Sequence, residues 1–410
     1  MTRRSSTSSL LLAAYAAETA SATWCLKLQN WTPVFSIVYF LSGIAFAVLL
    51  LRAPALRLSP ATQRPWRNPV YQRRAILIGL TVLAIYSWCL YWFDDMPIDV
   101  SNADMLPIIK VMCQRFLAGQ HSGVYDPIPA IWHGVQPIYL PAMWLPYVPA
   151  VAMGIDMRWI AVAGLLFAFA VFLLLYRPSN SRPGFFLGVI AFLLFWWVVA
   201  DNTPGIVSVS EEGVVIGYYV FLVLALLSGK PWLTGIAISV CMLSRYALVG
   251  WIPAFVVWLC LEKKYRQLGI VSLTGMACFV LLFLLPVGVP VFLRLARLPG
   301  NYIAFAARVW KDSPDVFSTA PGMAWFFGRN GTAILHWLLV LSSFIVPVVF
   351  TVAAFRKKRN NIPLAALKLT LVVFYCFIDV PYLYLFYTSS FVSLIILALA
   401  IRDERTGQAA

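Results

Sequence analysis

Long apolar runs with few charged residues recur along the chain and limit what it can fold into. The first run covers residues 33–51 and the last covers residues 381–401. A helix of roughly 20 apolar residues crosses the hydrocarbon core of a bilayer, where a backbone must satisfy its own hydrogen bonds. Only 11% of the 410 residues are charged, against about 25% in soluble domains. We therefore expect an all-α polytopic membrane protein.

Helix length and the loop signals together predict about 11 to 13 transmembrane helices. Spans are placed near residues 33–51, 75–93, 159–176, 184–200, 213–228, 231–244, 246–260, 268–290, 333–355, 363–379 and 381–401. The intervening stretch 137–155 contains four prolines, which interrupt helical hydrogen bonding. It is expected to form a broken or re-entrant segment rather than a full span.

The net charge of +15 is concentrated in the loops that join alternate spans. Basic loops face the cytoplasm, so the acidic loop 94–158 and the loop 291–332 are assigned to the outer face. This pattern predicts a multi-pass protein, placed in a bacterial inner membrane with its site facing outward. No soluble basic domain is present in the sequence, so no nucleic-acid partner is expected.

The N-terminal residues 1–30 are expected to form an extension or extra helix ahead of a single transmembrane domain at 31–405. Arg3 and Arg4, a short apolar stretch and Ala20-Ser21-Ala22 resemble a signal peptide, although Glu18 interrupts that pattern. Residues 406–410 are expected to form a cytoplasmic tail. The transmembrane domain includes a first catalytic-type outer loop, 94–140, and a second outer loop, 291–332.

The seven cysteines are scattered, and the three histidines do not have the spacing of metal ligands on a helix. We therefore expect neither a metal site nor a disulfide framework. His133 lies in the first outer loop, where it is either a substrate contact or an ordinary surface residue.

The first outer loop is longer than a typical connection and is rich in acids. Asn102 or Asp104 is placed to cap a helix whose apolar residues recur at helical spacing from Leu106 to Leu117. This helix is expected to lie flat on the outer membrane surface. Asp94 and Asp95 end the preceding span, where they are either a catalytic base or a solvated pair.

Other polar residues are candidates for substrate binding. Arg245 interrupts an apolar hairpin, where it contacts either a ligand phosphate or the lipid headgroups. Glu211 and Glu212 either bind sugar hydroxyls or belong to a solvated loop. In the second outer loop, Arg308 and Lys311 contribute to a basic patch suited to a lipid phosphate, with interfacial lipid contacts as the alternative.

Several short motifs of the first outer loop resemble a known class of enzymes. They are Asp94-Asp95, Asp104, Leu117-Ala118-Gly119, Val124-Tyr125-Asp126-Pro127 and Tyr139-Leu140-Pro141, with Ser244-Arg245-Tyr246-Ala247-Leu248 further along. This pattern is similar to the polyprenol-phosphate-sugar-dependent glycosyltransferases of the GT-C class. The closest resemblance is to the mannosyltransferase-like proteins of glycosyltransferase family 87.

The resemblance implies a GT-C-like helical bundle that transfers a hexose or pentose from a polyprenyl-phosphate-linked donor to a glycan, lipid or glycolipid acceptor. Asp94 or Asp95 would be the general base in an inverting single displacement, and Arg245 would contact the donor phosphate. Asp104 would be a second acidic residue of the site, and the motif residues Tyr125 and Tyr139 would bind substrate. No cofactor is implied, because a phosphate leaving group can be stabilised by basic side chains.

Two other functions fit an apolar bundle with these loops. A transporter or flippase of a lipid-linked saccharide would carry ionisable residues within the membrane, and often an internal repeat. A non-catalytic scaffold of an envelope assembly would need neither. The sequence shows no convincing internal repeat of the kind expected for a transporter.

Overall fold

The computed structural model describes residues 2–58, 69–131, 134–176, 182–295 and 302–406. Within these ranges the regular elements are helices, apart from one isolated antiparallel bridge between Ile128 and Val135. The expected all-α fold is therefore confirmed.

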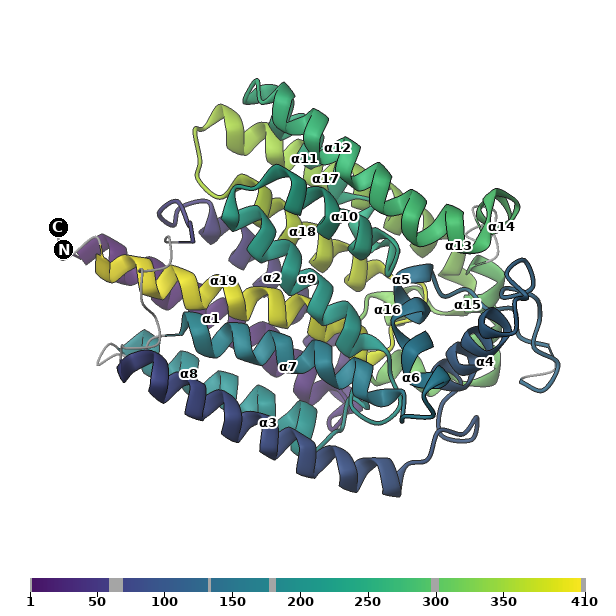
Figure 1. The fold of residues 1–410 in the computed structure, drawn as a ribbon. Helices are drawn as coiled ribbons and strands as arrows, with labels where there is room; N and C mark the ends of the chain where they lie inside the picture. The colour runs from purple at the N-terminus through teal and green to yellow at the C-terminus, as the bar shows by residue number, and fades with distance from the viewer. Residues whose placement is uncertain (1, 59–68, 132–133, 177–181, 296–301, 407–410) are drawn as a thin grey trace.

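Twelve longer helices form the bundle (Figure 1). Their bounds are α1 Thr2–Cys25, α2 Thr32–Leu50, α3 Pro69–Asp95, α7 Arg158–Leu175, α8 Arg182–Phe195, α9 Glu212–Ser228, α10 Pro231–Met242, α11 Trp251–Leu261, α12 Tyr265–Phe279, α17 Thr332–Arg356, α18 Ile362–Phe377 and α19 Phe386–Thr406. Among the described residues, seven helical stretches are long and apolar enough to cross a bilayer, and four shorter apolar helices accompany them. The chain is thus a multi-pass membrane protein.

Short helices gather at one end of the bundle, which we call the cap (Figure 1). The cap contains α4 Met105–Leu117, α5 Pro141–Trp144, α6 Val148–Ala152, α14 Val289–Leu295, α15 Tyr302–Asp312 and α16 Ala324–Phe327. The proline-rich stretch 137–155 supplies α5, α6 and the 3₁₀ turn Leu145–Tyr147 between them. None of these three pieces is long enough to cross a bilayer, as expected from the prolines.

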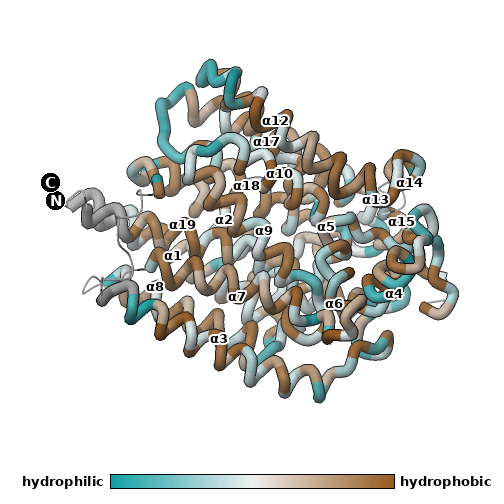
Figure 2. Tube along the Cα trace, in the orientation of Figure 1, coloured by the Kyte–Doolittle hydropathy of each residue, from teal (hydrophilic) through white to brown (hydrophobic). Residues whose placement is uncertain are grey.

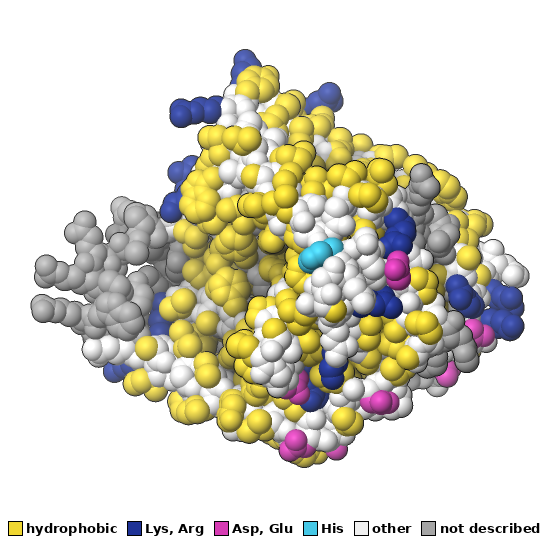
Figure 3. All heavy atoms as spheres, turned by 45° about the vertical axis from the view of Figure 1, so that its right-hand side comes forward, with side chains coloured by type: hydrophobic (Ala, Val, Ile, Leu, Met, Phe, Trp, Pro, Cys, Tyr) yellow, Lys and Arg dark blue, Asp and Glu magenta, His cyan; other side chains and the backbone are white. Residues whose placement is uncertain are grey.

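The opposite end of the bundle carries polar turns. The α11–α12 and α17–α18 connections are hydrophilic, whereas the helices between the two ends are mostly apolar (Figure 2). These two turns contain Lys263, Lys264, Lys357, Lys358 and Arg359. Figure 3 shows hydrophobic side chains over much of the face turned forward, with acidic and basic groups interspersed toward the cap.

Helix α19 lies at the centre of the bundle, and 94% of its most apolar 18-residue window is buried inside the protein. It packs against α1, α7, α8, α9 and α18. The helices α3, α12 and α17 are peripheral instead, with exposed apolar side chains such as Leu83, Leu273 and Leu341. In a protein of this class, such outward apolar faces contact lipid chains.

Helix α1 is packed into the bundle along most of its length. Leu11, Tyr15, Glu18 and Ala22 are fully buried, and α1 contacts α2, α8 and α19. The Ala20-Ser21-Ala22 sequence therefore lies inside a continuous, packed helix. In this structure the N-terminal segment takes the form of an extra helix.

Helix α4 forms where the first outer loop predicted it, with Asp104 at its N-cap position. Its apolar residues Leu106, Ile109 and Cys113 are buried in a cluster shared with α5 and α6. The expectation that this face lies on the membrane surface needs correction, because protein covers it. Contact with α5 and α6 accounts for the amphipathic pattern without a lipid surface.

Candidate functional site

A buried ionic cluster joins three residues predicted to bind substrate. One guanidinium nitrogen of Arg245, Nη2, donates hydrogen bonds to Glu211 Oε1 at 2.7 Å and to Glu212 Oε2 at 2.6 Å. Both glutamate side chains are 0% exposed, and that of Arg245 is 18% exposed. Arg245 has an extended backbone at the break between α10 and α11. That break places its side chain at the cap end of the bundle.

The start of α9 holds the two glutamates in place. Glu212 is the first residue of α9, where the helix dipole favours a negative charge, and its backbone N–H donates to Ser210 Oγ at 3.0 Å. Gly213 allows close packing against α7, since an added Cβ would lie 2.2 Å from the carbonyl oxygen of Ala161. On the other side, the Thr388 hydroxyl of α19 donates to Glu212 Oε1.

The ionic cluster does not satisfy all of its polar atoms. Among the described residues, Glu211 Oε2 and Arg245 Nε are buried without a hydrogen-bond partner, as are the hydroxyls of Tyr147 and Tyr219. Buried polar atoms in folded proteins usually have a hydrogen-bond partner, so an unpartnered buried atom is a candidate to bind water or a ligand. One positive and two negative charges also leave the ionic cluster with a formal charge of −1 when all three groups are ionised. The positive charge of Arg245 is therefore already compensated by the two glutamates, which weakens its predicted role as a phosphate contact.

Aromatic and acidic groups from the cap extend this cluster. The pKa of the Tyr139 phenol is raised well above its usual value by burial, and further by the negative charges of Glu211 and Asp104. The pKa of Tyr382 is raised to about 12 by burial and by Asp104. Asp104 thus acts electrostatically on two tyrosines of the region. The ring of Tyr384 lies 6.0 Å from the Arg245 guanidinium carbon.

Tyr125, another predicted substrate-binding residue, supports the segment that carries Tyr139. Its hydroxyl donates to the backbone carbonyl of Tyr139 at 2.9 Å and accepts a bond from Trp144 Nε1 at 3.0 Å. Tyr125 is fully buried. Its contacts are those of a residue that positions Tyr139.

Asp94 and Asp95, the predicted bases, lie at the exposed end of α3. Within the described part of the chain, neither side chain has a hydrogen bond or an ion pair to another side chain or to the backbone. The neighbouring Arg158 instead pairs with Asp156 and binds the carbonyls of Phe93 and Met96. The structure thus brings Asp104 to the cluster region and leaves Asp94 and Asp95 in solvent contact.

The remaining predicted residues lie outside the cluster or outside the described ranges. Arg308 and Lys311 are exposed on α15. The basic patch of the cap is partly neutralised, because Arg294 pairs with Asp126 at 2.9 Å. His133 lies outside the residues that the structure describes.

Sequence reasoning missed the contribution of the α18–α19 connection. Asp379, Tyr382, Tyr384 and Thr388 all come from this region, within or beside the last predicted span. The available signal was the number of polar groups in residues 379–393, which interrupt an otherwise apolar stretch. Such residues within a membrane segment usually face the bundle interior.

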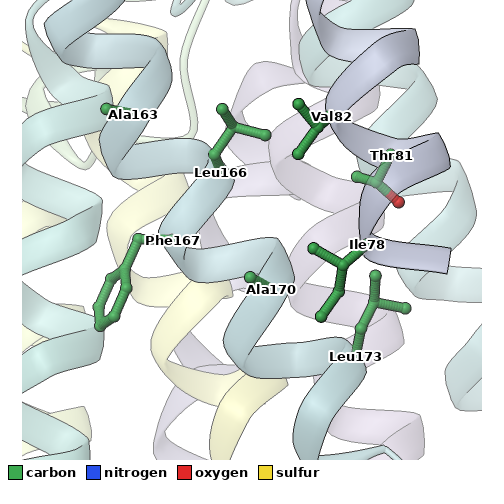
Figure 4. A pocket seen from close by; sticks show the side chains of 8 residues that line it. All are labelled: Ile78, Thr81, Val82, Ala163, Leu166, Phe167, Ala170 and Leu173. Carbon is green, nitrogen blue, oxygen red and sulfur yellow. The ribbon is translucent and has the colours of Figure 1, made fainter. Parts of the chain in front are cut away.

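A separate groove opens between α3 and α7 (Figure 4). It has a volume of about 280 Å³ and is lined by Ile78, Thr81, Val82, Ala163, Leu166, Phe167, Ala170 and Leu173. The Thr81 hydroxyl is already bonded to the Leu77 carbonyl at 2.8 Å. The groove therefore has an apolar lining and, among these described residues, no free polar group that could take part in chemistry.

Comparison with known proteins finds no matching family model, no matching curated protein and no matching solved structure. The functional argument consequently depends on the site itself.

Proposed function

We propose that this protein is a membrane glycosyltransferase of the GT-C type, closest to glycosyltransferase family 87. It would transfer a sugar from a polyprenyl-phosphate-linked donor to a glycan, lipid or glycolipid acceptor. The observation that carries the proposal is the convergence of Glu211, Glu212 and Arg245 with Asp104 and cap tyrosines at one end of a membrane bundle. Carboxylates accept hydrogen bonds from sugar hydroxyls, and tyrosine rings stack on sugar faces.

In the proposed reaction, an acceptor hydroxyl attacks the anomeric carbon of the donor. The new carbon–oxygen bond forms as the bond to the lipid phosphate breaks, with inversion at that carbon. The hydroxyl proton passes to a carboxylate, and the electron pair leaves with the phosphate. We assign the base role to Asp104 rather than to Asp94 or Asp95, because Asp104 begins α4 in the cap and its charge acts on Tyr139 and Tyr382, whereas Asp94 and Asp95 are exposed at the end of α3.

The departing phosphate needs positive charge. Arg245 shares its charge with two glutamates, but its Nε has no hydrogen-bond partner among the described residues and could still donate to a phosphate oxygen. Arg308 and Lys311 on α15 are exposed and available. We place the reaction on the outer face of a bacterial inner membrane. The basic turns lie at the end of the bundle opposite the cap and would face the cytoplasm, which leaves the cap on the outer side. The donor chain would remain in the bilayer.

The test is turnover by the purified protein in nanodiscs. Polyprenyl-phosphate mannose is supplied as donor and octyl α-mannoside as acceptor, with polyprenyl-phosphate arabinose as a second donor. Formation of a glycosylated octyl mannoside, lowered at least 100-fold in a folded Asp104→Asn variant, supports the proposal. Absence of product with both donors, from protein that remains folded, contradicts it.

A transporter of a lipid-linked saccharide is the second candidate, favoured by one observation. Lys368 and Glu18 form an ion pair inside the bundle, and both side chains are 0% exposed. Ionisable groups within membrane segments often mark transport pathways. Uptake of the lipid-linked sugar into proteoliposomes without a transfer product would favour this function over the enzyme.

A further inference from the structure

A second polar pair lies in the connection between α18 and α19. Asp379 Oδ2 lies 2.9 Å from His336 Nδ1 on α17, and the two side chains are 9% and 12% exposed. The other carboxylate oxygen, Asp379 Oδ1, is buried without a partner among the described residues. Asp379 therefore has one oxygen held by the protein and one available to a ligand.

This Asp379–His336 pair adjoins the cluster described above. Tyr382 and Tyr384 follow Asp379 in the same connection. The ring of Tyr384 lies 6.0 Å from the Arg245 guanidinium carbon, and the charge of Asp104 helps to raise the pKa of Tyr382. Tyr302 of α15, in the cap, lies within reach of the charges of both Asp379 and Arg245. Burial is the main cause that raises the pKa of its phenol, while the Arg245 charge lowers this pKa and the Asp379 charge raises it. The pair and the ionic cluster thus act on a common tyrosine.

A purely structural role explains only half of the pair. The bond to His336 ties the α18–α19 connection to α17, which is a sufficient reason for one carboxylate oxygen to be buried. It gives no reason to bury the second oxygen unpaired, because a buried acceptor without a partner keeps its desolvation cost uncompensated. A hydroxyl donor would remove that cost. An ammonium group would also, but sugar hydroxyls match the ligand of the adjacent cluster.

We propose that Asp379 binds a hydroxyl group of a saccharide through Oδ1, while His336 holds the carboxylate through Oδ2. The saccharide lies between this pair and the ionic cluster, with Tyr302 beside it. This inference rests on the proposed function for the identity of the ligand. Asp379 is a binding residue, and His336 is a positioning residue that acts through it.

The first experiment measures binding without turnover. Wild-type protein in nanodiscs is treated with dicyclohexylcarbodiimide, which modifies protonated carboxyl groups in apolar surroundings, and labelled peptides are quantified by mass spectrometry. Octyl α-mannoside at millimolar concentration is expected to lower labelling of the Asp379 peptide at least threefold. Labelling of Asp379 that is equal with and without the saccharide overturns the inference. The Asp379→Asn variant identifies the background.

The second experiment uses the transfer assay. Asp379→Asn is expected to raise the KM for octyl α-mannoside about 10-fold to 100-fold, as for a lost hydrogen bond to a charged group. His336→Gln, which keeps a donor near Oδ2, is expected to raise it less. The matched control is Asp315→Asn, an exposed acid of the cap. An unchanged KM in a folded Asp379→Asn variant overturns the inference.

The two experiments separate this inference from the proposed function. Protection of Asp379 in a protein that transfers no sugar would contradict the enzyme and support the saccharide site. Sugar transfer with a normal KM in Asp379→Asn would support the enzyme and contradict the site.

Discussion

Lys368 of α18 donates a hydrogen bond to Glu18 of α1, although the two residues are 350 positions apart in the chain. Ser389 of α19 completes the contact, lying 2.7 Å from Lys368 Nζ and 3.0 Å from Glu18 Oε1. All three side chains are fully buried. An N-terminal helix and the two last helices are thus joined by a charged contact inside an apolar bundle.

Lys368→Met is expected to destabilise the bundle by about 3–5 kcal/mol, because it leaves Glu18 as an uncompensated buried charge. Glu18→Leu combined with Lys368→Met is expected to recover most of this loss, since no buried charge then remains. The free energy of unfolding in detergent micelles measures both effects. A double variant that is less stable than Lys368→Met alone would contradict the role of the pair.

Arg245→Met is expected to cost about 3–5 kcal/mol of stability, since Glu211 and Glu212 would lose their shared cation. Adding Glu211→Gln and Glu212→Gln to it is expected to restore folding without restoring sugar transfer. Unfolding curves and the transfer assay are read on the same preparations. Arg294→Met is the matched control, because Arg294 pairs with Asp126 at a half-exposed position, where such pairs contribute about 0–1 kcal/mol.

Gly213→Ala is expected to destabilise the protein by about 1–3 kcal/mol, since overpacking forces the α7 and α9 backbones apart. The new Cβ would lie 2.2 Å from the Ala161 carbonyl oxygen. Gly79→Ala in α3 is the control, because its Cβ would meet nothing within 4 Å. Thermal unfolding compares the two variants, and equal transition temperatures would show that the α7–α9 contact has room to adjust.

Stability is expected to depend on pH through Asp379. Burial raises the pKa of this carboxyl above its usual value, and the His336 bond opposes part of the shift. The folded state therefore retains the proton more strongly than the unfolded chain, whose Asp pKa is about 3.9. The Asp379 contribution favours folding at low pH and is lost as pH rises from that value through the raised folded pKa. The difference in unfolding free energy between wild type and Asp379→Asn measures it, and a pH-independent difference would contradict the shift.

Asp104→Asn is expected to lower the rate of sugar transfer at least 100-fold, as for loss of a general base. Asp94→Asn and Asp95→Asn, singly and together, are expected to retain most of the activity, since both residues are exposed and lie outside the cluster. The measurement is kcat at saturating donor. If the double Asp94/Asp95 variant is inactive while Asp104→Asn remains active, the general base is Asp94 or Asp95 and not Asp104.

The helical class and the position of each long helix after α1 could be predicted from the sequence, whereas the sequence leaves the form of residues 1–30 open. Apolar length, the four prolines of 137–155 and the helical spacing from Leu106 to Leu117 all act locally. Apolar length and the proline breaks reflect the need of a backbone in a bilayer to satisfy its own hydrogen bonds. The helical spacing from Leu106 to Leu117 reflects a helix with one buried face. The amphipathic pattern of α4 was also visible, but the pattern alone does not distinguish a lipid surface from the protein that covers it.

The pairing of charges was decided only by the tertiary structure. Glu211, Glu212 and Arg245 were visible as separate candidates, yet no local rule places Arg245 Nη2 between both glutamates. Glu18 and Lys368 were visible only as interruptions of apolar segments. A charge inside an apolar bundle is tolerated only beside its partner. Which partner that is depends on how distant helices pack, and the sequence around each residue contains no record of that packing.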